Sequence, residues 1–329
     1  MRAVWIVLVS VVMAAMCVAC GSSRQCVVAD DPLAVPLDAP GQACPRFGVS
    51  TPGGPAAPGE YRAVADAVGV QPSVVLWFVD FSSPPPIAQL DAVRGWGADP
   101  VITWEPWRWV ADGEYDRSAF PMEQIAAGVH DDYLYRWADE LAAWGDTVYL
   151  RFAHEANGDW YPWSPAGGTP PQTYVDAWRH VHDLFAVKGV HNVRWVWTVN
   201  VPHPGSSPVA PLYPGDDYVD VVGVDGYNWG TTQPWSSWQE PEEIFGPTLD
   251  EVAALAPGRP VMVTEVASAE AGGSKPEWIR DLVSYLDSRE ELTAFVWFDL
   301  YKETDWRLAS SPESADAMSD ALNREHRTR

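Results

Sequence analysis

The chain has 329 residues, of which 47% are hydrophobic, and a formal net charge of -24 at pH 7. This length and apolar content suffice for one large domain or two ordinary ones. The acidic excess argues against binding to nucleic acid, whose phosphates would be repelled. The 19 tryptophans are a high count for this length, and tryptophan is also a common stacking surface for sugar rings.

The N-terminus has the features of an export signal. Arg2 forms a short positive region, and residues 4–18 are apolar apart from one serine, a stretch too short and too early for an ordinary membrane-spanning helix. Residues 16–23 resemble a bacterial lipoprotein cleavage box, with Cys20 as the lipidated first residue of the mature protein. We therefore expect a signal peptide at 1–19 and an extracytoplasmic protein, lipid-anchored to the bacterial cell membrane or secreted.

The cysteines fit this interpretation. With the signal removed and Cys20 acylated, Cys26 and Cys44 remain, and outside the cytoplasm they can form a disulfide, with two free thiols as the alternative. Residues 20–45 contain several prolines and no hydrophobic period, which predicts a tether. The remaining residues, 46–329, are expected to form a single catalytic domain.

Within this domain, apolar runs that predict strands alternate with amphipathic stretches that predict helices. The strand candidates are Phe47–Ser50, Val74–Val79, Pro100–Trp104, Thr147–Arg151, Val193–Trp197, Val219–Val224, Val261–Glu265 and Ala294–Phe298. The helix candidates are Glu60–Val68, Ile87–Trp96, Asp131–Trp144, Pro171–Ala186, Pro241–Ala256, Ser274–Asp287 and Pro312–Leu322. No helix is evident between Pro202 and Pro214. Strands that are apolar on both faces, in βα repeats without a Gly-rich phosphate loop, favour an α/β fold of the (β/α)8 TIM barrel type over a doubly wound sheet.

The barrel hypothesis predicts that functional residues lie where strands end, because the active sites of such barrels form at that face. Polar and aromatic residues gather at or just after the ends of most of the predicted strands. They are Asp80, Phe81, Trp104, Glu105, His154, Glu155, Asn200, Asp225, Tyr227, Glu265 and Trp297. This pattern indicates a polar cleft at one end of the barrel.

Two glutamates in this set suggest acid and base chemistry on a sugar. Glycosidic bond cleavage usually needs one protonated and one ionised carboxyl, about 5–5.5 Å apart when the anomeric configuration is retained. Glu155 and Glu265 would follow strands four and seven, which face each other across the mouth of an eight-stranded barrel. We assign Glu155 as the acid/base and Glu265 as the nucleophile, with Arg151 and Tyr227 holding Glu265 ionised and oriented.

Other residues near these strand ends are candidates to bind or support the substrate. They are His154, Asn157, Trp160, Trp297, Trp104 and Glu105. His154 and Trp160 could bind the sugar or desolvate Glu155 and raise its pKa, and Trp297 could be a stacking platform. For each of these residues a purely structural role is the alternative.

Metal and cofactor sites find little support. His154-Glu155 lacks a second histidine four positions after His154, where Gly158 stands, so it is not the zinc motif H-E-x-x-H. No nucleotide-binding glycine motif and no serine-hydrolase elbow occurs. We therefore expect neither a metal nor a cofactor.

The segment His154-Glu155-x-Asn157-Gly158-x-Trp160-Tyr161-x-Trp163 resembles the acid/base signature of glycoside hydrolase family 26. Residues 218–227 resemble the sixth-strand motif of that family, and Thr264-Glu265 its nucleophile strand. The resemblance extends from about residue 46 to 310. It implies a (β/α)8 retaining hydrolase with the glutamate roles assigned above, Tyr227 as hydrogen-bond partner of the nucleophile, His154 as a subsite ligand and Trp297 as a stacking platform.

The resemblance implies a retaining endo-β-glycanase that acts by double displacement on a β-linked polysaccharide. We expect the protein to be a monomer. β-1,4-Mannan is the first expected substrate, and mixed-linkage β-1,3-1,4-glucan is the second, because Ala156 and Asp159 differ from the residues of many mannanases of the family. A hydrolase of the cell's own exopolysaccharide is a further alternative. The alternative from another class is a non-catalytic carbohydrate-binding lipoprotein.

Overall fold

The computed structural model describes residues 27–39, 41, 44–111 and 113–323. The predicted signal peptide, Cys20 and Cys26 lie outside these residues, whereas Cys44 is disulfide-bonded. Within the described ranges, no helix combines the length and the apolar character that crossing a membrane requires.

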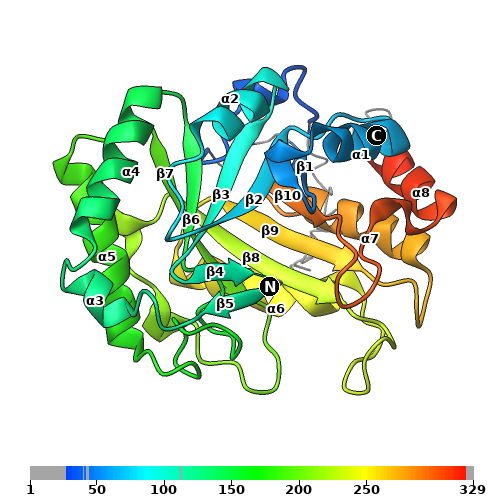
Figure 1. Cartoon of the computed structure of the whole chain (residues 1–329). Coiled ribbons are helices and arrows are strands. Elements are labelled where there is room, and N and C mark those ends of the chain that lie inside the picture. The colour runs from blue at the N-terminus through cyan, green and yellow to red at the C-terminus, as the bar shows by residue number, and fades with distance from the viewer. Residues whose placement is uncertain (1–26, 40, 42–43, 112, 324–329) are drawn as a thin grey trace, which may run out of the picture.

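The strands form a closed parallel barrel, which confirms the predicted fold (Figure 1). In the described part of the chain the barrel strands are β1 (Arg46–Ser50), β2 (Val74–Asp80), β3 (Asp99–Glu105), β6 (Val148–Phe152), β7 (Val193–Asn200), β8 (Val221–Asn228), β9 (Val261–Ser268) and β10 (Leu292–Phe298), and β10 pairs with β1 to close the ring. Every predicted strand run overlaps one of them.

Helices surround the barrel, as expected from the amphipathic stretches. They are α1 (Pro58–Val68), α2 (Ile87–Gly95), α4 (Asp131–Trp144), α5 (Pro171–Val187), α6 (Pro241–Leu255), α7 (Lys275–Asp287) and α8 (Pro312–Leu322). Several begin with proline, which lacks the N–H that the first helical turn leaves unpaired. Between β7 and β8 the described helical elements are two short 3-10 turns, at Ala210–Leu212 and Asp216–Tyr218, and the sequence predicted no helix between Pro202 and Pro214.

The sequence did not predict the elements that follow β3. There β4 (Arg108–Ala111) and β5 (Glu114–Asp116) pair as an antiparallel hairpin, and α3 (Met122–Ala126) is a short helix. The hairpin is attached to the barrel by the carboxylate of Asp80, which accepts a hydrogen bond of 2.7 Å from the backbone N–H of Trp109. Both strands are short and largely exposed, so they lack the apolar run that identifies a buried strand.

Alternate residues of each barrel strand face opposite layers. Inside the barrel, a small core contains Leu76, Val101, Tyr149, Val196, Val221, Met262, Ala294 and Val296 among others. The larger core, outside the barrel, lies between strands and helices and holds most of the buried tryptophans.

The segment that was predicted to be a tether is in part attached to the N-terminal end of the barrel. Leu37 is fully buried in the inner core, its N–H donates to the Tyr149 hydroxyl at 2.9 Å, and Asp38 pairs with Arg194 at 2.7 Å. The buried side chain of Leu37 and the ion pair of Asp38 therefore hold in place a segment whose composition is typical of a loop.

Candidate active site

A polar layer lies directly above the inner core, toward the C-terminal ends of the strands. Three neighbouring strands place Thr103, Arg151 and Thr198 two residues beyond an inner-core position, and β8 places Asp225 four residues beyond Val221, which is again on the inward face. All four side chains are buried. The strand period therefore determines which polar residues share this layer.

Glu265 reaches the same layer through an irregularity in β9. The pairing of β8 with β9 shifts between Val224 and Asp225, so that Asp225 lies opposite Glu265. Such a bulge reverses the alternation of side chains along a strand. As a result the Glu265 carboxylate faces the barrel mouth, although Val263 of the same strand faces the outer core.

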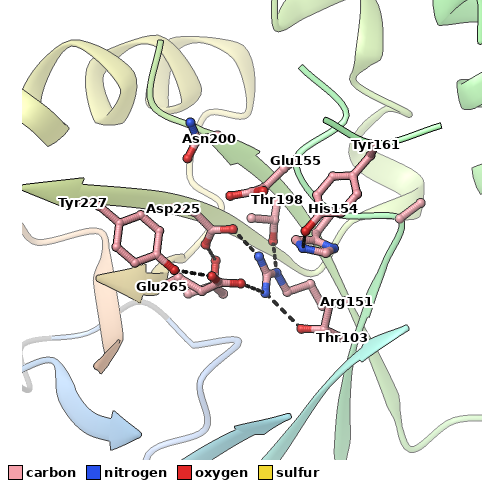
Figure 2. A network of polar contacts seen from close by, with 12 residues as sticks. Thr103, Arg151, His154, Glu155, Tyr161, Thr198, Asn200, Asp225, Tyr227 and Glu265 are labelled. Atoms are coloured by element: carbon pink, nitrogen blue, oxygen red, sulfur yellow. Dashed lines mark hydrogen bonds and ion pairs between the residues drawn. The ribbon is translucent and has the colours of Figure 1, made fainter. Parts of the chain in front are cut away.

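Arg151 is the centre of the polar layer (Figure 2). Its guanidinium donates to Glu265 Oε1 at 2.6 Å and to Thr103 Oγ1 at 2.9 Å. It also donates to Thr198 Oγ1 at 3.1 Å and forms an ion pair with Asp225. Because the Arg151 side chain has no exposed surface, these partners supply the charge and hydrogen bonds that a buried guanidinium requires.

Tyr227 completes the environment of Glu265. Its hydroxyl donates to Glu265 Oε2 at 2.5 Å, so each oxygen of this carboxylate accepts a hydrogen bond, one from Tyr227 and one from Arg151. Arg151 and Tyr227 thus have the contacts with Glu265 that were expected from the sequence. Two donors fix the orientation of the carboxylate.

Glu155 lies on the loop after β6, three residues beyond the strand end. Ala153 and Glu155 have positive φ angles of 44° and 52°, a conformation that costs energy in residues other than glycine and often marks functional sites. The backbone N–H groups of Ala153 and Glu155 donate to carbonyls of the flanking strands, to Trp104 at 3.1 Å and Thr198 at 2.9 Å. The loop is therefore held on both sides.

The carboxyl groups of Glu155 and Glu265 meet at the mouth of the barrel. One oxygen of each, together with one of Asp225, lies within 4.8 Å of the others, and Figure 2 shows the three groups around Arg151. Each glutamate is 6% exposed. Burial, and secondly the charge of Glu265, raises the pKa of Glu155 to about 7. Glu155 therefore carries a proton at a pH where an ordinary glutamate is ionised.

Trp160 and His154 lie beside the acid, as expected from the sequence. The indole N–H of Trp160 donates to Glu155 Oε2 at 2.7 Å. The Nε2 atom of His154 is 2.9 Å from the hydroxyl of Tyr161. Burial, with a contribution from the nearby Arg151 charge, lowers the pKa of His154 well below its usual value, so the imidazole is neutral.

Three of the candidates to bind or support the substrate do not line the mouth. Trp104 faces the helices, where its ring stacks on Trp137 at 4.3 Å. Trp297 is fully buried and faces α7, with its centroid 6.4 Å from that of Trp278. The amide of Asn157 is 1% exposed and bridges to the backbone of Asn200. The two tryptophans point away from the mouth because side chains alternate along a strand and both occupy outward-facing positions.

The mouth contains aromatic residues that the sequence analysis did not select. Phe298, next to Trp297, occupies the inward position, and its ring lies edge-on to Tyr227 at 5.6 Å and to Phe78 at 6.4 Å. The role of Asp225 was also not foreseen, although it was noted as a strand-end residue. Counting alternate residues forward from the inner-core positions Val221 and Val296 gives Asp225 and Phe298.

The three neighbouring carboxylates could in principle ligate a metal, but their charge has another partner. The guanidinium of Arg151 bonds to both Asp225 and Glu265 and so occupies the place of a cation among them. Its positive charge opposes that of any metal ion bound beside it. The donor chemistry of this cluster therefore suits proton transfer better than metal binding.

Comparison with known proteins identifies the family. The family model described as Glycosyl hydrolase family 26 matches residues 123–288, about half of the chain. The chain belongs to glycosyl hydrolase family 26. This confirms the resemblance seen in the sequence, and the matched region includes both Glu155 and Glu265.

Individual members of family 26 show the same relationship. The chain is 41% identical over 252 residues to "Endoglucanase H" of Acetivibrio thermocellus, across 75% of this chain and 26% of that protein. It is 28% identical over 141 residues to a mannan endo-1,4-beta-mannosidase of Bacillus subtilis, across 41% of this chain and 34% of the relative. The chain thus spans about a quarter to a third of these two relatives.

Solved structures agree on the fold. The catalytic domain of a family 26 endo-beta-1,4-mannanase from Bacillus sp. JAMB-750 superimposes with a TM-score of 0.63 at 18% identity, covering 84% of this chain and 85% of that one. A family 26 beta-mannanase from Bacteroides ovatus gives a TM-score of 0.62 at 17% identity, covering 86% and 89%.

Proposed function

We propose that this protein is a retaining endo-β-glycanase that hydrolyses a β-linked polysaccharide by double displacement, with Glu155 as acid/base and Glu265 as nucleophile. The observation that carries the proposal is the approach of these two carboxyls to within 4.8 Å at one barrel mouth. Retaining glycosidases place their carboxyls about 5–5.5 Å apart, whereas inverting enzymes leave about 6.5–9.5 Å for a water molecule. The separation therefore supports direct attack by a carboxylate.

The environments of the two glutamates support this division of roles. Glu265 accepts hydrogen bonds from Arg151 and Tyr227 on its two oxygens, which orients it as a nucleophile. Glu155 has a pKa raised to about 7 by burial and by the charge of Glu265, which suits a group that must both give and take a proton near neutral pH.

The reaction then has two balanced steps. In the first, Glu155 donates its proton to the glycosidic oxygen while that oxygen leaves the anomeric carbon, and Glu265 forms an ester bond to the same carbon. In the second, Glu155 takes a proton from water, the resulting oxygen bonds to the anomeric carbon, and the ester bond to Glu265 breaks. Once Glu265 is esterified its negative charge is lost, so the pKa of Glu155 falls and the group becomes a base.

Small-anion rescue tests both roles at once. Glu265→Ala should stop turnover, and azide should restore it with an aryl β-glycoside by attacking from the vacated nucleophile side, which gives an α-glycosyl azide. In Glu155→Ala, azide should attack the ester intermediate from the leaving-group side and give a β-glycosyl azide. Product anomers are read by NMR.

The matched control is Glu114→Ala, because Glu114 is an exposed glutamate of β5 and should leave turnover unchanged. Retained activity of Glu265→Ala, or the same azide anomer from both variants, would contradict the assignment. Glu155→Ala should also slow substrates with poor leaving groups far more than activated aryl glycosides, since only the former need the proton.

Two polysaccharides are candidates. β-1,4-Mannan is the first, since several family 26 relatives and structures bear the name of a mannanase. β-Glucan is the second, because the relative named an endoglucanase matches 75% of this chain at 41% identity. A panel of galactomannan, lichenan and laminarin with product analysis separates them, and retardation in affinity gels without cleavage of any would support a carbohydrate-binding protein instead.

A further inference from the structure

A cavity of about 530 Å³ lies beside the catalytic mouth, on the side of β2, β3 and the β4–β5 hairpin. Its volume is in the range of pockets that hold small ligands. The ring of Phe78, 37% exposed, forms part of its wall and also lies 6.0 Å from the ring of His154. Phe78 thus borders the cavity and lies next to His154, the residue that precedes Glu155.

Aromatic surface and one buried acid characterise the lining. Trp109 and Tyr115 of the hairpin are 61% and 42% exposed and line the cavity. Glu105, at the end of β3, also lines it but is only 6% exposed. The ring of Tyr115 stacks on that of Trp107 at 3.9 Å, and the exposed surface of Trp109 and Tyr115 offers flat faces to sugar rings.

The hydrogen bonding of Glu105 is incomplete. The indole N–H of Trp107 donates to Oε2 at 3.1 Å, and no described residue bonds to Oε1. The proposed mechanism does not use this carboxyl. Burial, reinforced by the charge of Glu265, raises the pKa of Glu105 to about 8, so at neutral pH the group can both donate and accept a hydrogen bond, as a sugar hydroxyl can.

The position of the acid shows which part of a substrate would lie here. Glu155 must face the leaving group, and Trp160, which bonds to it, packs on His203 in the loop after β7 with centroids 4.9 Å apart. The leaving-group half therefore extends toward β7. The cavity at β2 and β3 lies on the other side of β6 in the barrel order, where the glycon half continues.

We propose that this cavity binds the glycon sugar units beyond the one attacked by Glu265, and that Glu105 recognises a hydroxyl of one of them. The inference rests on the proposed glycanase function. It assigns to Glu105 a role in binding and chain-length preference, and to Trp109 and Tyr115 the stacking of sugar rings.

Several titratable groups face Glu105 and enter any pH dependence. They are Asp80, Tyr115, Arg151, Tyr161, Glu265 and Lys302. The Arg151 and Lys302 charges lower the pKa of Glu105, whereas that of Glu265 raises it. Deprotonation of Glu105 above about pH 8 removes its donor, so KM for substrates that occupy the cavity should then increase.

Aryl β-glycosides with one, two or three glycon units and the same leaving group test the proposal. For the wild type, kcat/KM should increase as units enter the cavity. Glu105→Ala should reduce this increase about tenfold, the equivalent of one hydrogen bond, with little change for the one-unit substrate. Glu105→Gln keeps a donor and an acceptor and should retain the increase, as should the control Glu114→Ala.

The outcomes are distinguishable from failure of the proposed function. No turnover of any substrate by the wild type contradicts the glycanase itself. The subsite is contradicted if kcat/KM of Glu105→Ala still increases with each extra glycon unit as it does in the wild type. It is also contradicted if Glu105→Ala slows all three substrates equally. If Glu105→Ala does not fold, the pH profile of Glu105→Gln decides: KM of the wild type, but not of this variant, should increase above about pH 8, and parallel profiles overturn the inference.

Discussion

The raised pKa of Glu155 can be tested by removing the charge that faces it. In Glu265→Gln the nucleophile becomes neutral but keeps its shape, and its partners Arg151 and Tyr227 remain. Coulomb's law for two charges within 4.8 Å at an effective dielectric constant of about 20 gives about 3.5 kcal/mol, equivalent to about 2.5 pKa units.

This figure gives only the order of magnitude. Each negative charge is shared by two oxygens, so the mean separation exceeds the closest one, and burial, the larger cause of the raised pKa, is unchanged by the substitution. We therefore expect the pKa of Glu155 to fall by at least about one unit.

The measurement is a titration of carboxyl 13C shifts in protein labelled on glutamate, with the Glu155 signal identified by its absence in Glu155→Gln. Glu114→Gln is the control and should not move the signal. A pKa for Glu155 within about 0.3 unit of the wild-type value in Glu265→Gln would refute the electrostatic coupling. In the active wild type, the alkaline limb of kcat/KM should fall with a pKa of about 7.

Three further substitutions test other parts of the molecule. Arg151→Met removes the cation that pairs with two buried carboxylates and should lower the free energy of unfolding by about 3–5 kcal/mol in urea titrations. Adding Asp225→Asn should recover part of this loss. If the effects of the two substitutions on the free energy of unfolding simply add, the two side chains are not coupled. Tyr227→Phe removes a donor to Glu265 and should lower kcat about tenfold or more without changing stability, which steady-state kinetics and thermal melts can check. Lys275 is buried with its pKa lowered to about 8; because the unfolded chain keeps the proton to higher pH, the stability of the wild type relative to Lys275→Met should increase from about pH 8 to 10.5, and a constant difference would contradict this.

The sequence predicted the barrel because buried parallel strands and amphipathic helices carry local signals. Runs such as Val261–Glu265 are mostly apolar on both faces, and helices such as α4 show an amphipathic period that ends at a glycine, so each element is identifiable from its own residues. The β4–β5 hairpin was missed because it buries little and so has no apolar pattern.

The site was predictable in type but not in full membership. Glutamates at strand ends, with histidine and tryptophan beside them, indicated a sugar-cleaving cleft before any coordinates. Trp104 and Trp297 were among the candidates to bind or support the substrate, and both face away from the mouth, because proximity to a strand end does not tell on which side of the strand a residue lies.

The amino-acid sequence by itself determined the order of strands and helices, the barrel and the residue types available at its mouth, because these follow from short-range hydrophobic periods. Only the tertiary structure decided which of those residues meet. A bulge in β9 turns Glu265 inward, and the alternation of side chains along β10 turns Trp297 outward. Arg151 meets Asp225, 74 positions away, and Glu265, 114 positions away. These three features arise from strand register. Register is set by packing across the whole barrel, which no local segment encodes.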